Sequence, residues 1–188
     1  MNKMPTAQAT ADYLIWLAAN ENRDEPEYLT PLQLQKLLYY VQGWSWAEFG
    51  RPFFSDEIQA WKAGPVVPSV YDRYKDQGRN LPIISESTPH IPELSDEERA
   101  HIHAVWDAYK NYSGIALSEI SHREAAYRES YTPQDASGRC KVRIDESLIR
   151  RDFSGRAATV LARVSSKREK LRAYAAAKTR DLVGRDAF

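Results

Sequence analysis

Residues 29–44 read LTPLQLQKLLYYVQGW, and the rest of the chain is organised around them. Thr30 followed by Pro31 predicts the start of a helix, because the threonine hydroxyl can accept from a free N–H of the first turn and proline there has no N–H to leave unpaired. Both faces of the following helix are apolar or aromatic, and Lys36 is the only charge on the face that carries Leu32, Tyr39, Gly43 and Trp46. A helix that is apolar on two sides is buried on two sides, so we expect a central helix that ends near Gly50.

Gly43 lies inside this predicted helix, where glycine costs about 1 kcal/mol relative to alanine. We expect the close approach of another backbone to explain it.

Hydrophobic spacing and capping signals predict further helices and two short strands along the chain. Residues 63–68 (AGPVVP) predict an irregular turn, because they hold a glycine and two prolines. The helices are expected over residues 6–22, 69–75, 95–109, 115–128, 145–153 and 154–183, and the strands over residues 56–62 and 139–144.

Together these elements define a fold class. We predict a mainly α, compact multi-helix domain around a central buried helix, with a small two- or three-stranded β element and a C-terminal helical arm. Residues 1–153 would form the domain and residues 154–188 a basic helical extension.

The composition is that of an ordinary globular protein. The 188 residues have a formal net charge of zero and include one cysteine, Cys140, which excludes an internal disulfide and fits a reducing cytoplasm. No run is apolar enough to span a membrane, and no leader precedes the first helix, so we expect a cytoplasmic protein.

The charge is unevenly divided along the chain. Residues 139–188 hold fourteen Lys or Arg against six Asp or Glu. This excess is typical of a basic interaction surface or, more simply, of a solvated helix.

The residues that could carry chemistry do not form a recognisable active site. His101 and His103 lie two apart, so on a helix they point in different directions, and no further ligand completes a metal site. His122 and Glu124 suggest an acid–base pair, but no nucleophile elbow and no glycine-rich phosphate loop accompany them. We expect no enzyme, no metal and no cofactor.

Two blocks of sequence resemble a known family. Residues 29–44, together with IQAWKAGPVVPSVY at 58–71, resemble the Panacea domain, whose family includes SocA-type antitoxins and GepA-like phage-associated proteins. LSEISHRE at 117–124 is similar to the family helix that ends in His-x-Glu, and the resemblance would cover residues 8–153. The family continues with one residue and then Pro-Trp, whereas Ala125, Ala126 and Tyr127 stand here.

The resemblance implies an antitoxin that binds and neutralises a cognate toxin protein and, in the SocA branch, acts as an adaptor that delivers the toxin to the ClpXP protease. It places the contact surface on the turn between Trp61 and Tyr71, since a proline-stiffened loop is preorganised. Five polar residues either brace that turn or meet the partner, and we favour bracing: Gln35, Lys36 and Gln42 of the central helix, with His122 and Glu124. The candidate partner-binding residues are Gln35, Lys36, Tyr39, Trp61, Lys62, Gly64, Pro65, Val66, Val67, Pro68, Tyr71, His122 and Glu124.

Two alternatives remain open. The basic C-terminal region could contact DNA phosphates in a DNA-associated regulator, although the zero net charge makes a nucleic-acid partner the less favoured reading. His122 and Glu124 could instead serve a small hydrolase or transferase.

Overall fold

The computed structural model describes residues 4–21, 28–83, 93–132 and 142–157. It confirms a mainly helical fold with a small three-stranded sheet. No helix in these ranges is both long enough and apolar enough to cross a membrane. The elements, in chain order, are α1 (Ala7–Glu21), α2 (Pro31–Phe49), β1 (Gln59–Trp61), β2 (Gly64–Val66), α3 (Pro68–Tyr74), the 3-10 turn η1 (Lys75–Gln77), α4 (Asp96–Tyr109), α5 (Gly114–His122), α6 (Ala125–Ser130) and β3 (Val142–Arg143).

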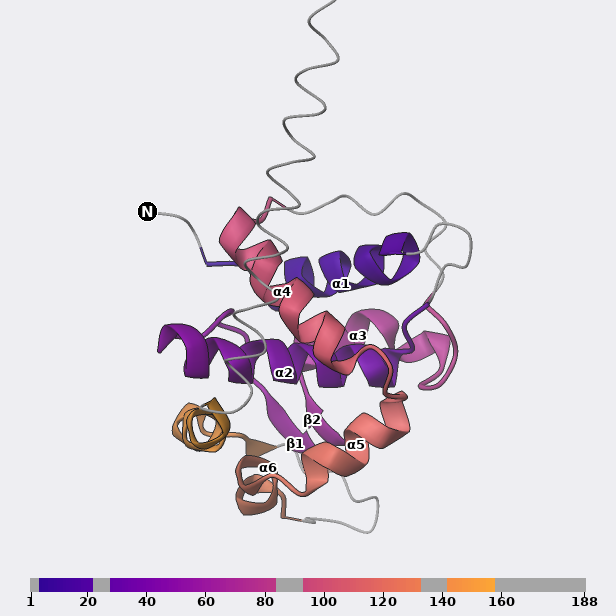
Figure 1. Ribbon diagram of the computed structural model, residues 1–188. Helices are drawn as coiled ribbons and strands as arrows, with labels where there is room; N and C mark the ends of the chain where they lie inside the picture. The colour runs from indigo at the N-terminus through magenta and orange to yellow at the C-terminus, as the bar shows by residue number, and fades with distance from the viewer. Residues whose placement is uncertain (1–3, 22–27, 84–92, 133–141, 158–188) are drawn as a thin grey trace, which may run out of the picture.

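Helix α2 is the predicted central helix. The Thr30 hydroxyl accepts from the N–H of Gln33 at 3.2 Å, and Gly50 ends the helix in the left-handed conformation at φ +67°. Helices α1 and α4 pack on one side of α2, and α5 and the strands lie on the other (Figure 1). The prediction of a helix buried on two sides is confirmed.

The sheet has the order β2-β1-β3, and both pairs of strands are antiparallel. The two predicted strands therefore pair as expected in the part that the structure describes. The prediction that residues 63–68 are irregular is wrong in part, because Gly64 to Val66 form β2. Pro65 is tolerated there because β2 is an edge strand, where proline need not donate to a further neighbour.

Residues 115–128 do not form one helix as predicted. Helix α5 ends at His122 and α6 begins at Ala125, with Glu124 in extended conformation between them at φ −77° and ψ 138°. Glu124 is 2% exposed and the Asp152 carboxylate accepts from the N–H of Ala126 at 2.6 Å. The break between α5 and α6 therefore depends on tertiary contacts with residues distant in sequence, such as Asp152, and not on a local signal.

A helix over residues 146–157 follows β3. It continues past residue 153, where the sequence predicted that it would end. Its Phe153 ring lies against Gly43, where an added Cβ would come within 2.3 Å of ring carbons. Gly43 thus makes room for an aromatic side chain and not, as expected, for a backbone. The division of the chain after residue 153 stays a prediction. Cys140 and the predicted arm beyond residue 157 lie outside the described residues.

Candidate functional site

The hairpin of β1 and β2 forms the centre of the site. Trp61 pairs with Gly64 across a turn made by Lys62 and Ala63. No residue other than glycine has a positive φ in the described part of the chain, and Gly64 has φ +100°. Because Lys62 and Ala63 therefore have negative φ, the turn is neither type I′ nor type II′, and glycine supplies the one positive φ that the hairpin needs.

Four hydrogen bonds from three helices hold the backbone of this hairpin. Lys36 Nζ on α2 donates to the Pro65 carbonyl oxygen at 2.8 Å, and Gln35 Oε1 accepts from the N–H of Val67 at 2.7 Å. Ser118 on α5 and Tyr127 on α6 also hydrogen bond to the hairpin backbone. Their hydroxyls donate to the carbonyl oxygens of Ala63 at 2.7 Å and of Trp61 at 2.8 Å. The hairpin is therefore fixed from behind by buried polar side chains.

Lys36 is fully buried, and burial disfavours the charged form of its ammonium group. Burial, together with the nearby positive charge of Arg79, lowers the pKa of Lys36 to about 7. Burial also lowers the pKa of His122, and the charge of Lys36 lowers it further. Both shifts favour the neutral form of the side chain behind the hairpin.

The pKa of Lys36 predicts a pH dependence of stability. The folded-state pKa lies below the unfolded value of 10.5, so the cost of burying the charge is fully present below pH 7 and is relieved as the pH rises towards 10.5. We expect wild-type protein to gain about 1 kcal/mol per pH unit between pH 7 and 9, relative to Lys36→Met. Urea unfolding of both proteins at the two pH values measures this, and equal pH slopes would contradict it.

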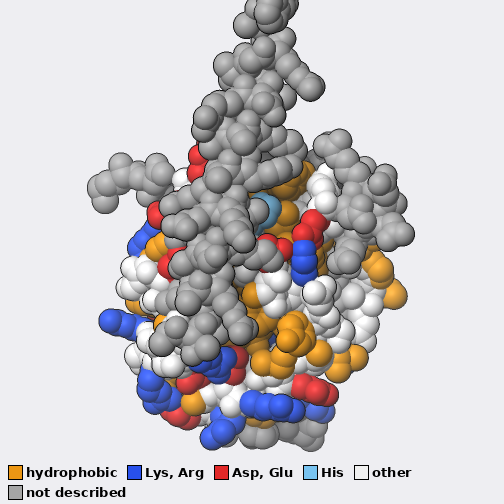
Figure 2. Space-filling view, in the orientation of Figure 1, with side chains coloured by type: hydrophobic (Ala, Val, Ile, Leu, Met, Phe, Trp, Pro, Cys, Tyr) orange, Lys and Arg blue, Asp and Glu red, His pale blue; other side chains and the backbone are white. Residues whose placement is uncertain are grey.

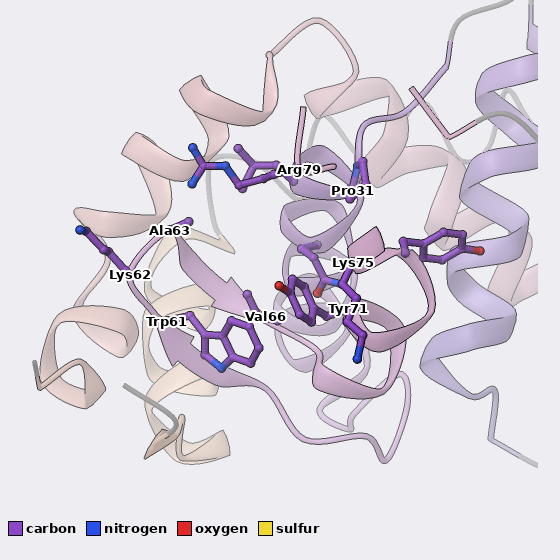
Figure 3. Close-up of a pocket in the computed structure, with 11 residues that line it drawn as sticks. Pro31, Trp61, Lys62, Ala63, Val66, Tyr71, Lys75 and Arg79 are labelled. Atoms are coloured by element: carbon purple, nitrogen blue, oxygen red, sulfur yellow. The ribbon is translucent and has the colours of Figure 1, made fainter. Parts of the chain in front are cut away.

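A groove with a volume of about 200 Å³ opens in front of the hairpin (Figure 3). The Trp61 and Tyr71 rings meet edge to face with their centroids 4.7 Å apart. Lys62, Lys75 and Arg79 lie on the rim. The lining residues are Pro31, Leu32, Gln35, Trp61, Lys62, Ala63, Val66, Tyr71, Tyr74, Lys75 and Arg79.

The structure brings some of the predicted site residues together and separates others. Gln35, Trp61, Lys62, Val66 and Tyr71 line the groove. A second set, consisting of Lys36, Gly64, Pro65 and Val67, is buried with or directly behind the hairpin.

Pro68 is half-buried at the start of α3 and outside the groove lining. Gln42, expected to brace the turn or meet the partner, holds a different loop. Its side-chain oxygen accepts from the N–H of Phe53 at 2.8 Å and from that of Phe54 at 3.2 Å.

Tyr39 and Glu124 belong to a separate buried cluster. Glu124 Oε1 accepts from the Tyr40 hydroxyl at 3.3 Å and from Arg156 Nη1 at 2.7 Å. Burial raises the pKa of the Glu124 carboxyl, and Tyr39 and Arg156 oppose that shift. This cluster fastens the helix over residues 146–157 to α2.

His122 and Glu124 have different neighbours. The His122 ring lies against the Tyr127 ring, with centroids 4.6 Å apart and the rings tilted by 35°. Glu124 faces Tyr40 and Arg156. No hydrogen bond joins His122 to Glu124 among the described residues, so the suggested acid–base pair is not assembled there.

The other two histidines within the described ranges, His101 and His103, have structural partners. His101 Nδ1 lies 2.8 Å from Glu48 Oε2, and its Nε2 lies 3.0 Å from the Val41 carbonyl oxygen. His103 Nε2 lies 3.0 Å from the Tyr13 hydroxyl. Within the described ranges, no three His, Cys, Asp or Glu residues are placed to hold a metal ion.

Several residues of the site were missed from the sequence. Arg79, Lys75 and Tyr74 reach the groove because η1 turns the chain back towards α2, where the N–H of Leu32 donates to the Arg79 carbonyl oxygen at 3.1 Å. Ser118 and Tyr127 carried no local signal, since each meets the hairpin across more than fifty residues of chain.

The fold and the site define a class of protein: a helical scaffold that presents a braced β-hairpin and a small groove. Comparison with known proteins gives the family. The model of the family described as "Antitoxin SocA-like, Panacea domain" matches residues 34–127, half of the chain. The chain belongs to this family.

One curated relative is the protein named Antitoxin SocA from Caulobacter vibrioides (strain NA1000 / CB15N). The two are 40% identical over 72 residues, which is 38% of this chain and 36% of the relative. The match thus spans about a third of that relative's length. No solved structure matches.

Proposed function

We propose that this protein is an antitoxin that binds a partner toxin protein through the groove and the adjoining hairpin, and so neutralises it. The observation that carries the proposal is the rigid hairpin. Four hydrogen bonds from buried side chains fix its backbone, while Trp61 and Tyr71 stay half-exposed and Lys62 is exposed. Binding to a preorganised surface loses little conformational entropy, and aromatic residues in such positions are typical hot spots.

Within this proposal, six of the thirteen residues inferred from the sequence fall into two roles. Trp61, Lys62 and Tyr71 would touch the toxin directly. The buried residues Gln35, Lys36 and Glu124 would act by positioning, since side chains that are at most 3% exposed cannot offer a partner much surface. The protein would therefore work by binding and not by catalysis.

The test is co-expression with the product of the neighbouring reading frame. We expect that product to be toxic alone, harmless beside this protein and captured by it in a pull-down. A neighbour that is harmless alone, or that stays toxic and unbound, would refute the proposal.

Alanine at both Trp61 and Tyr71 should weaken toxin binding at least about tenfold and abolish protection, because hot-spot aromatics each contribute on the order of 2 kcal/mol. Titration calorimetry with purified toxin measures the affinity, and survival of the co-expressing cells measures protection. Tyr112→Ala is the matched control, since Tyr112 is 45% exposed and lies outside the groove. Unchanged affinity in the double variant would place the interface elsewhere.

Delivery of the toxin to ClpXP is the second part of the proposal, supported by the resemblance to the SocA branch, and it implies a cytoplasmic protein. A chain ending at residue 157 keeps Phe153 and Arg156 in place while it removes the basic extension. If delivery depends on that extension, the toxin half-life in cells should lengthen although binding persists. A toxin that is equally stable in cells with and without ClpX would leave simple blocking as the mechanism.

DNA binding is the second candidate, and the basic excess after residue 139 favours it. Where the structure describes this region and its surroundings, Lys and Arg along the lower edge in Figure 2 alternate with acidic side chains. Arg151 pairs with Glu129 at 2.6 Å and Arg143 with Glu146 at 3.0 Å. A filter assay that detects no duplex binding at low salt would remove this candidate.

A further inference from the structure

The groove carries charge of one sign. Its lining contains the cations Lys62, Lys75 and Arg79 and no Asp or Glu. Lys75 is balanced by Asp72 at 3.1 Å. In the part of the chain that the structure describes, no ion pair is recorded for Lys62 or Arg79, so these two rim cations are free to meet charges on a partner.

The floor of the groove also favours acceptors over donors. Gln35 is the one amide in the lining, and its Oε1 already accepts from the N–H of Val67. The NH₂ group of the same amide can only donate, and because Gln35 is 3% exposed it offers a ligand little direct contact.

The walls set the second requirement. Trp61, Tyr71, Pro31, Leu32 and Val66 make them largely apolar. A volume of about 200 Å³ is below the 300–1,000 Å³ that small-molecule sites usually have. It is nevertheless suited to one large side chain of a partner protein, which enters while the rest of the partner stays outside.

We propose that the groove takes an acidic peptide segment of the partner toxin, with an aromatic or aliphatic side chain between its carboxylates. The apolar side chain enters beside Trp61 and Tyr71, and the carboxylates meet Lys62 and Arg79. This inference rests on the proposed function for the identity of the partner, and its chemistry follows from the groove itself. Complementary charge at the rim speeds encounter and excludes basic partners.

The test uses purified full-length protein with two probes: the toxin, and a fluorescein-labelled octapeptide, Ser-Asp-Glu-Phe-Leu-Glu-Asp-Ser. Lys62→Glu combined with Arg79→Glu should weaken binding of both probes about tenfold, because each rim charge then repels the acidic segment. Binding to wild-type protein should weaken as salt rises, since exposed charges are screened. Circular dichroism checks the fold, and Lys62→Gln with Arg79→Gln is the milder variant should the reversal unfold the protein.

The matched control is a double variant that changes the net charge by the same amount near the C-terminal end of α2, away from the groove. Arg51→Glu with Arg150→Glu alters two cations that lie over Phe49 and Trp46, away from the groove. This variant should bind both probes within about twofold of wild type, as expected for charges beyond a Debye length. Peptides with lysine at the four acidic positions, or serine at Phe and Leu, should bind at least about tenfold more weakly than the parent peptide, because they lack one of the two required features.

The outcomes separate this inference from the proposed function. A toxin that binds wild type and the groove variant equally would overturn the inference and leave the antitoxin assignment standing. A toxin that never binds, beside an acidic peptide that binds in the groove, would refute the assignment and support the groove chemistry. Preference for the lysine peptide, equal binding of the serine peptide, or stronger binding of a single-stranded oligonucleotide would each overturn the inference.

Discussion

Gly43→Ala should lower the free energy of unfolding by about 3 kcal/mol, as expected for overpacking at a site that cannot relax. The added Cβ would lie 2.3 Å from two carbons of the Phe153 ring. The ring cannot easily retreat, because the Tyr39, Tyr40 and Trp44 rings surround it with centroid distances of 5.5, 6.1 and 5.1 Å. Chemical denaturation of the full chain measures the loss.

Gly155→Ala is the control for helix propensity. Gly155 lies in the helix over residues 146–157, and nothing is within 4 Å of a Cβ added there. That change should stabilise the protein by up to about 1 kcal/mol, because alanine is the better helix former. Gly43→Ala combined with Phe153→Ala should cost less than the sum of the two single changes. Additive losses, or a stable Gly43→Ala protein, would mean that the ring does not occupy this space.

Gly64→Ala is expected to cost about 3 kcal/mol and to weaken toxin binding, because strain and collision act together. The backbone at Gly64 has φ +100°, which a residue with a Cβ rarely adopts. The new Cβ would lie 2.8 Å from both Lys36 Nζ and Ser121 Oγ. Lys36 could move away only by losing its hydrogen bond to Pro65, and the hairpin would then lose one of its braces.

Gly50→Ala separates the backbone strain at positive φ from the collision of the added Cβ. Gly50 also has a positive φ, at +67°, but nothing lies within 4 Å of an added Cβ. It should therefore show only the backbone cost, roughly 1–2 kcal/mol, and leave toxin binding unchanged. If both alanine variants lose the same stability and bind the toxin equally well, the close approach of Lys36 to Gly64 contributes neither to stability nor to toxin binding.

The helices with strong local signals were predicted closely. Thr30 and Pro31 start α2, Gly50 ends it, and Ser95 with Glu98 forms the expected capping box of α4. These signals act between residues at most four apart, so the chain carries them wherever it folds. The same is true of the two-sided apolar pattern that makes α2 central.

The site was predicted only in part. Proline and glycine located the turn between Trp61 and Tyr71, and bracing by Gln35 and Lys36 was the favoured alternative, as their hydrogen bonds now indicate. The groove itself was not foreseen. Its other wall comes from Tyr74, Lys75 and Arg79, whose approach to α2 depends on the turn of the chain after α3.

Sequence alone specified the elements, the burial of α2 and the position of the stiffened turn, because propensity, capping and periodicity are local properties. The tertiary structure decided which partners those elements meet. The Phe153 ring fills the space at Gly43. The buried Glu124 carboxylate, at the break between α5 and α6, accepts from Arg156, and Lys36 donates to the carbonyl oxygen of Pro65. Each of these contacts joins residues at least 29 positions apart, and no local preference encodes such a pairing; it forms because buried polar groups and large rings must find complementary neighbours once the chain is compact.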